Sequence, residues 1–209
     1  MVDNDDKIDI SGKHVYKFGD GEADGDPQDK NTLGGKGAAL AGATLMGLPV
    51  PPGFTISTDV CNLYLKTDGF PEKIRKEVHE ALEWMEDLMG KGFGDPEDPL
   101  LVSTRSGARQ SMPGMMETVL NVGLTTETIP GLIEITGNER FVYDTYRRLI
   151  TMYSDVVMEK AEGDKPEDGK GIRQQLEWIL QKRKREKGYV NDTQLTVEDL
   201  KELCDEYKQ

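Results

Sequence analysis

Apolar residues recur at intervals of three and four over residues 72–89, with charged residues on the opposite face, and Gly90 follows directly. This pattern predicts an amphipathic helix that ends at a glycine cap. Thr196 and Asp199 form a capping pair at the start of the last helical pattern. Further helical patterns cover residues 140–159, 172–187 and 197–208. The second half of the chain is therefore expected to be mainly helical.

Strand patterns are confined to the first part of the chain. Residues 14–18 alternate in polarity, residues 54–57 follow a proline-rich turn, and residues 100–104 form a short apolar run that predicts a buried strand ending at Arg105. Small residues and leucines over 37–46 predict a tightly packed helix. Lys36 is therefore expected at a helix N-terminus.

These elements predict an α+β fold, in which a small subdomain of strands and helices is followed by a mainly helical subdomain. We expect a flexible tail over 1–12, an α/β nucleotide-binding subdomain over 13–124 and a helical subdomain over 125–209. Two polar, glycine-rich stretches have too few apolar groups to offset the entropy lost on ordering. The first, residues 19–30, predicts a loop. The second, residues 159–171, predicts a hinge or an exposed insertion. A chain of 209 residues is long enough for one or two such domains.

Composition narrows the classes of function. The net charge of −13 argues against broad nucleic-acid binding, and the basic run 181–187 is interpreted as a solvated helix end whose cations complement the helix dipole. No run of about 18 apolar residues predicts a membrane span, and the acidic N-terminus lacks the features of a signal peptide, so a cytoplasmic location is expected. Cys61 and Cys204 are then expected to be free thiols.

The segment Gly34-Gly35-Lys36-Gly37 is a candidate anion site. Glycine permits positive φ and close backbone approach, a helix start adds partial positive charge, and lysine supplies a full charge. It is not a Walker A loop, because Gly37 stands where that motif needs Ser or Thr for magnesium. A glycine-rich turn that merely precedes a helix remains the alternative.

Arg105 is the second candidate phosphate ligand. It follows an apolar strand, and a guanidinium can bind two phosphate oxygens in one plane. A structural arginine paired with a carboxylate is the alternative. Arg109 could contact a second phosphate or the adenine edge, although a surface arginine is the preferred interpretation.

Residues 111–118 could form a flexible lid, in which Gly114 is the hinge and methionines cover a nucleotide. A buried turn filled by methionine is the competing interpretation. Glu117 could approach magnesium, or be a solvated or helix-capping group. No residue is assigned as a metal ligand. Neither histidine, His14 or His79, carries a catalytic signature, and both are expected to be structural or exposed.

Five residues of the helical half are interpreted as helix-surface charges and packing groups. They are Asp144, Tyr146, Arg147, Arg148 and Asp155.

Three segments, 33–39, 47–55 and 102–121, together resemble the N-terminal nucleotide-binding region of the pyruvate phosphate dikinase family. Residues 140–158 also resemble a helical segment of that family, so that the likeness covers most of 13–160. The resemblance implies an ATP-grasp-like domain that transfers the β-phosphoryl group of ATP to a histidine on a separate domain, which carries it to pyruvate. Thr104 and Glu117 depart from the expected pattern, which puts a magnesium contact by Glu117 in doubt.

By residue match, the resemblance makes Lys36 and Arg105 the ATP phosphate contacts and catalytic candidates. The other nucleotide-binding candidates are Gly34, Gly35, Arg109, Ser111, Met112 and Thr118.

The resemblance also implies ATP and Mg²⁺ as ligands, with the metal ligands outside this chain, and a homodimeric parent enzyme. The partners would then be ATP and the remaining domains of that enzyme, with no nucleic acid and no membrane. We expect residues 1–209 to be an N-terminal fragment that is inactive alone. Two alternatives remain: a noncatalytic nucleotide-sensing or scaffold module, and a dikinase of the phosphoenolpyruvate synthase type.

Overall fold

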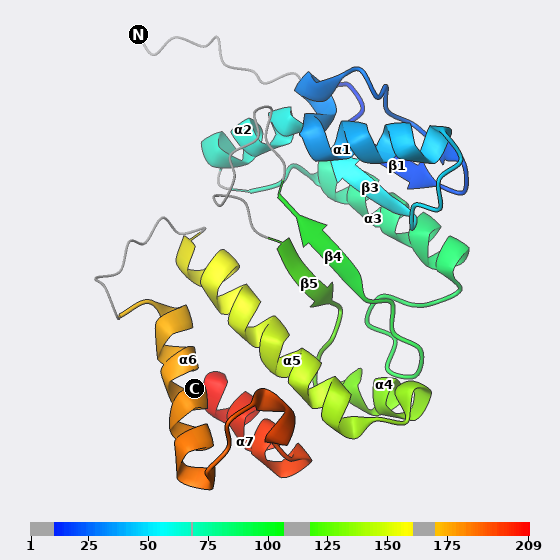
Figure 1. The fold of residues 1–209 in the computed structure, drawn as a ribbon. Helices are drawn as coiled ribbons and strands as arrows, with labels where there is room; N and C mark the ends of the chain where they lie inside the picture. The colour runs from blue at the N-terminus through cyan, green and yellow to red at the C-terminus, as the bar shows by residue number, and fades with distance from the viewer. Residues whose placement is uncertain (1–10, 68, 107–117, 161–169) are drawn as a thin grey trace, which may run out of the picture. The chain divides into compact units, whose positions relative to one another are not determined.

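The computed structural model describes residues 11–67, 69–106, 118–160 and 170–209 (Figure 1). Two compact units divide the chain: unit 1 contains residues 1–90 and 106–116, and unit 2 contains residues 91–105 and 117–209. The described residues form mainly helices with two small antiparallel sheets, so the expected α+β class is confirmed.

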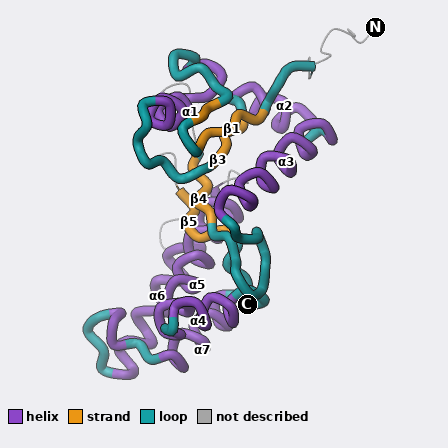
Figure 2. The backbone as a smooth tube through the Cα atoms, turned by 90° about the vertical axis from the view of Figure 1, so that its right-hand side faces the viewer, coloured by secondary structure: helices purple, strands orange, loops and turns teal. Residues whose placement is uncertain are grey.

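The elements of unit 1 are, in chain order, β1 (Val15–Gly19), β2 (Glu22–Ala23), α1 (Lys30–Leu45), β3 (Gly53–Ile56), α2 (Thr58–Thr67) and α3 (Glu72–Met89). The central strand β1 pairs antiparallel with both neighbours, in the order β2-β1-β3. Helices α1 and α3 lie on opposite sides of this sheet (Figure 2). The sheet and the two helices thus form a small layered core.

The predicted helix over 72–89 is confirmed as α3. Its buried side chains include Ile74, Ala81 and Met85, which share one face because they recur at helical spacing. Gly90 ends the helix in the left-handed conformation with φ 61°, as a glycine cap requires. The strands expected over 14–18 and 54–57 are also present, as β1 and β3.

The elements of unit 2 are β4 (Val102–Arg105), β5 (Thr118–Val122), α4 (Ile129–Thr136), α5 (Glu139–Tyr153), a π-helical segment (Ser154–Lys160), α6 (Ile172–Lys187), a 3-10 turn (Asp192–Gln194) and α7 (Val197–Tyr207). Strands β4 and β5 form an antiparallel pair. Helix α5 packs against β5, α4 and α7, and α6 packs against α7 and the π-helical segment. One apolar cluster lies around Val119, Val142 and Leu149, and another around Leu180 and Leu200.

Several local features differ from the expectations. The sequence pattern did not predict β2, β5, α2 or α4, which are short and carry little periodicity. The buried strand expected over 100–104 is instead β4, whose residues Ser103–Arg105 are exposed, because β4 pairs only with β5. Most of the expected tail and hinge lies outside the described residues.

The expected subdomain boundary at residue 124 stays a prediction. The compact units differ from it because β4 and β5 cluster with the helical half. The reason is packing: Val119 of β5 is buried in the same apolar cluster as Val142 of α5. Among the described residues, no helix combines the length and apolar character needed to cross a bilayer.

Three charged residues interpreted as surface charges, Arg147, Asp155 and Lys184, are instead buried in ion pairs, which corrects that interpretation for these residues. Arg148 and the helix-end residues Arg185 and Lys187 are exposed, as interpreted. Arg147, which is 6% exposed, pairs with Asp144 at 2.8 Å and with Asp192 at 3.4 Å. Lys184 pairs with Asp192 at 2.8 Å. Burial raises the pKa of Asp192, but the hydrogen bond and charge of Lys184, with Arg147, outweigh burial and hold that pKa below its usual range.

Asp155 is also buried, at 3% exposed, and pairs with Arg173 at the start of α6. The pairs Arg147–Asp192 and Asp155–Arg173 join different elements, so the helical spacing of a single element could not reveal them.

Candidate functional site

The glycine segment lies at a break within α1. Gly34 has φ 68° and ψ 172°, which is not helical and is a conformation that essentially only glycine adopts. Before the break, Asp29 caps the first turn, because its Oδ1 accepts hydrogen bonds from the amides of Asn31 (3.1 Å) and Thr32 (3.0 Å). After the break the helix resumes, so Lys36 lies in the first turn of the rear segment. This matches the expected helix start near Lys36.

The two glycines that flank Lys36 have different roles. A Cβ at Gly37 would lie 2.7 Å from Cγ2 and 2.8 Å from Oγ1 of Thr55, so α1 packs on β3 at a distance that excludes a side chain. A Cβ at Gly35 would meet nothing within 4 Å. Gly37 therefore fixes the rear segment on the sheet, while the exposed backbone at Gly35 is open to a ligand.

The Lys36 side chain is exposed but held. Its Nζ donates a hydrogen bond to the carbonyl oxygen of Ser106 at 2.8 Å, and Ser106 belongs to the same compact unit. An ammonium group has three N–H donors, so this bond leaves donors for an anion. The contact orders one end of a flexible side chain before a ligand binds.

Arg105 is the last residue of β4 and is exposed. Its Cα partner across the antiparallel pair is Thr118, the first residue of β5, which is partly buried. Among the residues that the structure describes, none forms an ion pair with Arg105. Unit 2 therefore brings Arg105 and Thr118 together, and unit 1 brings together Gly34, Gly35 and Lys36.

Other predicted contacts cannot be placed. Arg109, Ser111 and Met112, together with Glu117, lie outside the described residues. His79 is exposed on α3, near Glu83, whereas His14 is buried.

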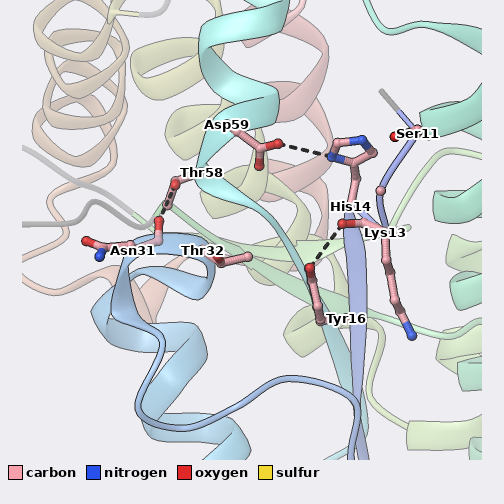
Figure 3. Close-up of a pocket in the computed structure, with 9 residues that line it drawn as sticks. Ser11, Lys13, His14, Tyr16, Asn31, Thr32, Thr58 and Asp59 are labelled. Atoms are coloured by element: carbon pink, nitrogen blue, oxygen red, sulfur yellow. Dashed lines mark hydrogen bonds and ion pairs between the residues drawn. The ribbon is translucent and has the colours of Figure 1, made fainter. Parts of the chain in front are cut away.

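A pocket of about 320 Å³ was not predicted from the sequence (Figure 3). It is lined by the residues before β1, including His14, and by the first turns of α1 and α2. The carboxylate of Asp59 lies 3.2 Å from Nδ1 of His14, which is 4% exposed. Lys13 at the rim pairs with Asp24 at 2.8 Å, so its charge is already compensated. The proximity of His14 and Asp59 could not be predicted from their spacing in the sequence. It arises because β1, which follows His14, pairs with β3, which precedes Asp59.

Within the described ranges, no group of three or more His, Cys, Asp or Glu side chains is arranged to hold a metal ion. The described candidate residues are instead hydrogen-bond donors: a lysine and glycine backbone in unit 1, and an arginine in unit 2. Such a donor set suits an anion rather than a cation.

Comparison with known proteins agrees with this donor chemistry. Residues 30–88 match a family model described as pyruvate phosphate dikinase, AMP/ATP-binding domain. This match supports nucleotide binding and includes the break at Gly34 and Lys36.

The chain is 48% identical to pyruvate, phosphate dikinase of Clostridium symbiosum over 94% of its length and 21% of the relative's. It is 46% identical to pyruvate, phosphate dikinase 1, chloroplastic, of Zea mays over 97% of its length and 20% of the relative's. The enzyme of Giardia intestinalis is 42% identical over 95% of this chain and 22% of its own length. The resemblance to pyruvate phosphate dikinases is thereby confirmed over nearly the whole chain. The chain spans about a fifth of the length of these curated relatives.

Proposed function

We propose that this chain binds the phosphates of ATP as the N-terminal portion of a pyruvate phosphate dikinase. The observation that carries the proposal is the break in α1 at Gly34, which opens the backbone and places Lys36 in the first turn of a helix. Backbone amides, a helix N-terminus and an ammonium group are three sources of positive potential at one place. The match of residues 30–88 to an AMP/ATP-binding domain supports it.

Lys36 and Arg105 are the proposed phosphate ligands. Phosphoryl transfer depends mainly on positioning and on stabilising charge, so the lysine of unit 1 and the arginine of unit 2 are each chemically suited to bind phosphate. Arg105 is exposed at the end of a strand, and the planar guanidinium of an arginine can bind two phosphate oxygens at once. Gly34 and Gly35 would contribute backbone, and Arg109, Ser111, Met112 and Thr118 are proposed further nucleotide contacts.

The parent reaction that we propose converts ATP, phosphate and pyruvate to AMP, diphosphate and phosphoenolpyruvate, through a phosphohistidine on another domain. Within the described residues the donor set does not fit a protein-held metal, so we propose that Mg²⁺ is bound by ATP and by groups elsewhere in the enzyme. A homodimeric parent and a cytoplasmic location stay predictions, and the maize relative is described as chloroplastic.

Calorimetric titration with ATP tests the proposal. We expect Lys36→Ala to weaken ATP binding by about 1–3 kcal/mol, the size of a charge-assisted contact. Lys30→Ala is the matched control, because Lys30 is an exposed lysine at the start of the same helix. Equal effects of the two substitutions would mean that only general charge matters, and the proposed role of Lys36 would be wrong.

Arg105→Ala should weaken ATP binding to a similar degree, with Arg185→Ala as its control. Arg185 is also an exposed arginine of unit 2 but lies at the end of α6. The purified chain alone should form no AMP in the presence of ATP, phosphate and pyruvate. Pyruvate-dependent AMP formation would contradict the proposal that the chain is an inactive portion of the enzyme.

A further inference from the structure

The front turn of α1, directly before the break, is bound by a side chain of the neighbouring helix α2. In an unbroken helix the carbonyl of Asn31 accepts from the amide four residues later, at position 35. Here Gly34 is not helical, and the Asn31 carbonyl accepts a hydrogen bond from Oγ1 of Thr58, the first residue of α2, at 2.5 Å (Figure 3). Thr58 thus binds the front turn of α1 directly before the break.

Thr58 itself is placed by well-anchored neighbours. The amide of Ser57 donates to the carbonyl of His14 at 2.9 Å, and the next residue, Asp59, faces the His14 ring. Val60 is 2% exposed and lies in an apolar cluster with Ile74 of α3. The hydroxyl of Thr58 is therefore fixed relative to β1 and α3.

The segment that carries Lys36 lies between two fixed points. The rear segment of α1 is fixed at Gly37, which packs against Thr55 of β3. The front turn is fixed by the Asp29 cap and by the Thr58 hydroxyl. Because the backbone at Gly34 and Gly35 has no side chain to hold it, these two attachments determine the conformation of the break and hence the direction of Lys36.

We propose that Thr58 is a positioning residue for nucleotide binding: its hydroxyl holds the glycine break so that Lys36 is directed at the phosphates. The effect of Thr58 on nucleotide binding rests on the proposed function. Its role in holding the glycine break does not. Thr58 contacts no phosphate in this account and acts through Lys36.

The structural step is tested by hydrogen–deuterium exchange on Thr58→Val, which removes the hydroxyl and keeps the shape, and on Thr58→Ser, which keeps the hydroxyl. Peptides that cover residues 33–39 should exchange about fivefold faster in Thr58→Val, the change expected for one lost hydrogen bond. Peptides of α3 and of unit 2 should be unchanged, and Thr58→Ser should behave as the wild type. Unchanged exchange over 33–39, or faster exchange everywhere, would overturn the proposal.

The functional step is tested by a double-mutant cycle with ATP. Thr58→Val should weaken ATP binding about fivefold in the wild-type background and leave it unchanged in the Lys36→Ala background. Equal losses in both backgrounds would mean that Thr58 acts by general stability, which would overturn the positioning role. If the wild-type chain binds no ATP, the proposed function fails, and the exchange experiment alone still decides whether Thr58 holds the break.

Discussion

Arg105 and Thr118 are direct Cα partners in the antiparallel pair of β4 and β5. The candidate phosphate ligand therefore sits where the chain leaves this pair, and Thr118 sits where the chain returns. The segment 102–121, which contains Arg105 and Thr118, thus begins in β4 and ends in β5, the two strands of one antiparallel pair. The proposed role of Arg105 therefore depends on the register of β4 and β5.

The register predicts a disulfide. In a Cys61→Ser background, the pair Arg105→Cys and Thr118→Cys should cross-link on mild oxidation, since directly opposite residues have Cα atoms about 4.5–5.5 Å apart, within the disulfide range. The control pair, Thr104→Cys with Thr118→Cys, is offset by one residue, which directs its side chains to opposite faces. Faster cross-linking of the control, measured by mass spectrometry, would show that the register is wrong.

The neighbouring glycines Gly34 and Gly35 should respond differently to alanine. Gly34→Ala forces a side chain into a backbone conformation that favours glycine and should destabilise unit 1 by about 1–3 kcal/mol. Gly35→Ala meets no atom within 4 Å and should leave stability within about 1 kcal/mol. Thermal unfolding measures both. A weaker affinity for ATP in Gly35→Ala with unchanged stability would further support close approach of the phosphates, and equal destabilisation by both substitutions would contradict the assigned break.

The capping box of α7 predicts an acid-dependent stability. Burial raises the pKa of Asp199, but the Thr196 amide and hydroxyl, with Lys187, outweigh burial and lower it overall. The pKa of Asp199 is lower in the folded chain than in the unfolded chain, where an aspartate has a pKa of about 4, so the ionised carboxylate stabilises the fold above that pH. This contribution is lost as the pH falls through the pKa of the folded state. Unfolding of wild type and Asp199→Asn, measured between about pH 6 and pH 2, should therefore converge in stability at the acid end. Curves that stay parallel throughout would contradict this origin.

The two cysteines should differ in reactivity. Cys61 is exposed on α2, whereas burial raises the pKa of Cys204 to about 12, and its Sγ contacts the Tyr143 carbonyl at 3.7 Å. Since the thiolate is the reactive form, iodoacetamide at pH 8 should modify Cys61 and leave Cys204 intact in the folded chain. Peptide mass spectrometry reads both sites. Comparable labelling before unfolding would contradict the packing of α7.

Elements with strong local signals could be predicted from the sequence. The helix α3 was predicted together with its cap at Gly90, because an apolar stripe and a left-handed glycine are both local properties. The start of α7 was predicted from Thr196 and Asp199 for the same reason. By contrast, β5 and α4 are short, and packing against α5 rather than periodicity determines them.

The candidate site was predictable to a similar extent. The glycine segment and Lys36 were recognisable, because the conformational freedom of glycine is a property of the residue itself. The ion pairs of the buried residues Arg147 and Asp155 with Asp192 and Arg173 were not, since the partners lie on other elements. Thr58 was missed for this reason too: its partner Asn31 lies on α1, and only the fold brings α2 beside it.

Whether Lys36 binds nucleotide phosphates can be measured by a titration series with ATP, ADP, AMP and adenosine. Wild type and Lys36→Ala are compared for each ligand, with Lys30→Ala as control. The account predicts that the loss caused by Lys36→Ala is largest for ATP, shrinks as phosphates are removed and disappears for adenosine. A loss of equal size for all four ligands, or wild-type binding that does not depend on the phosphates, would contradict it.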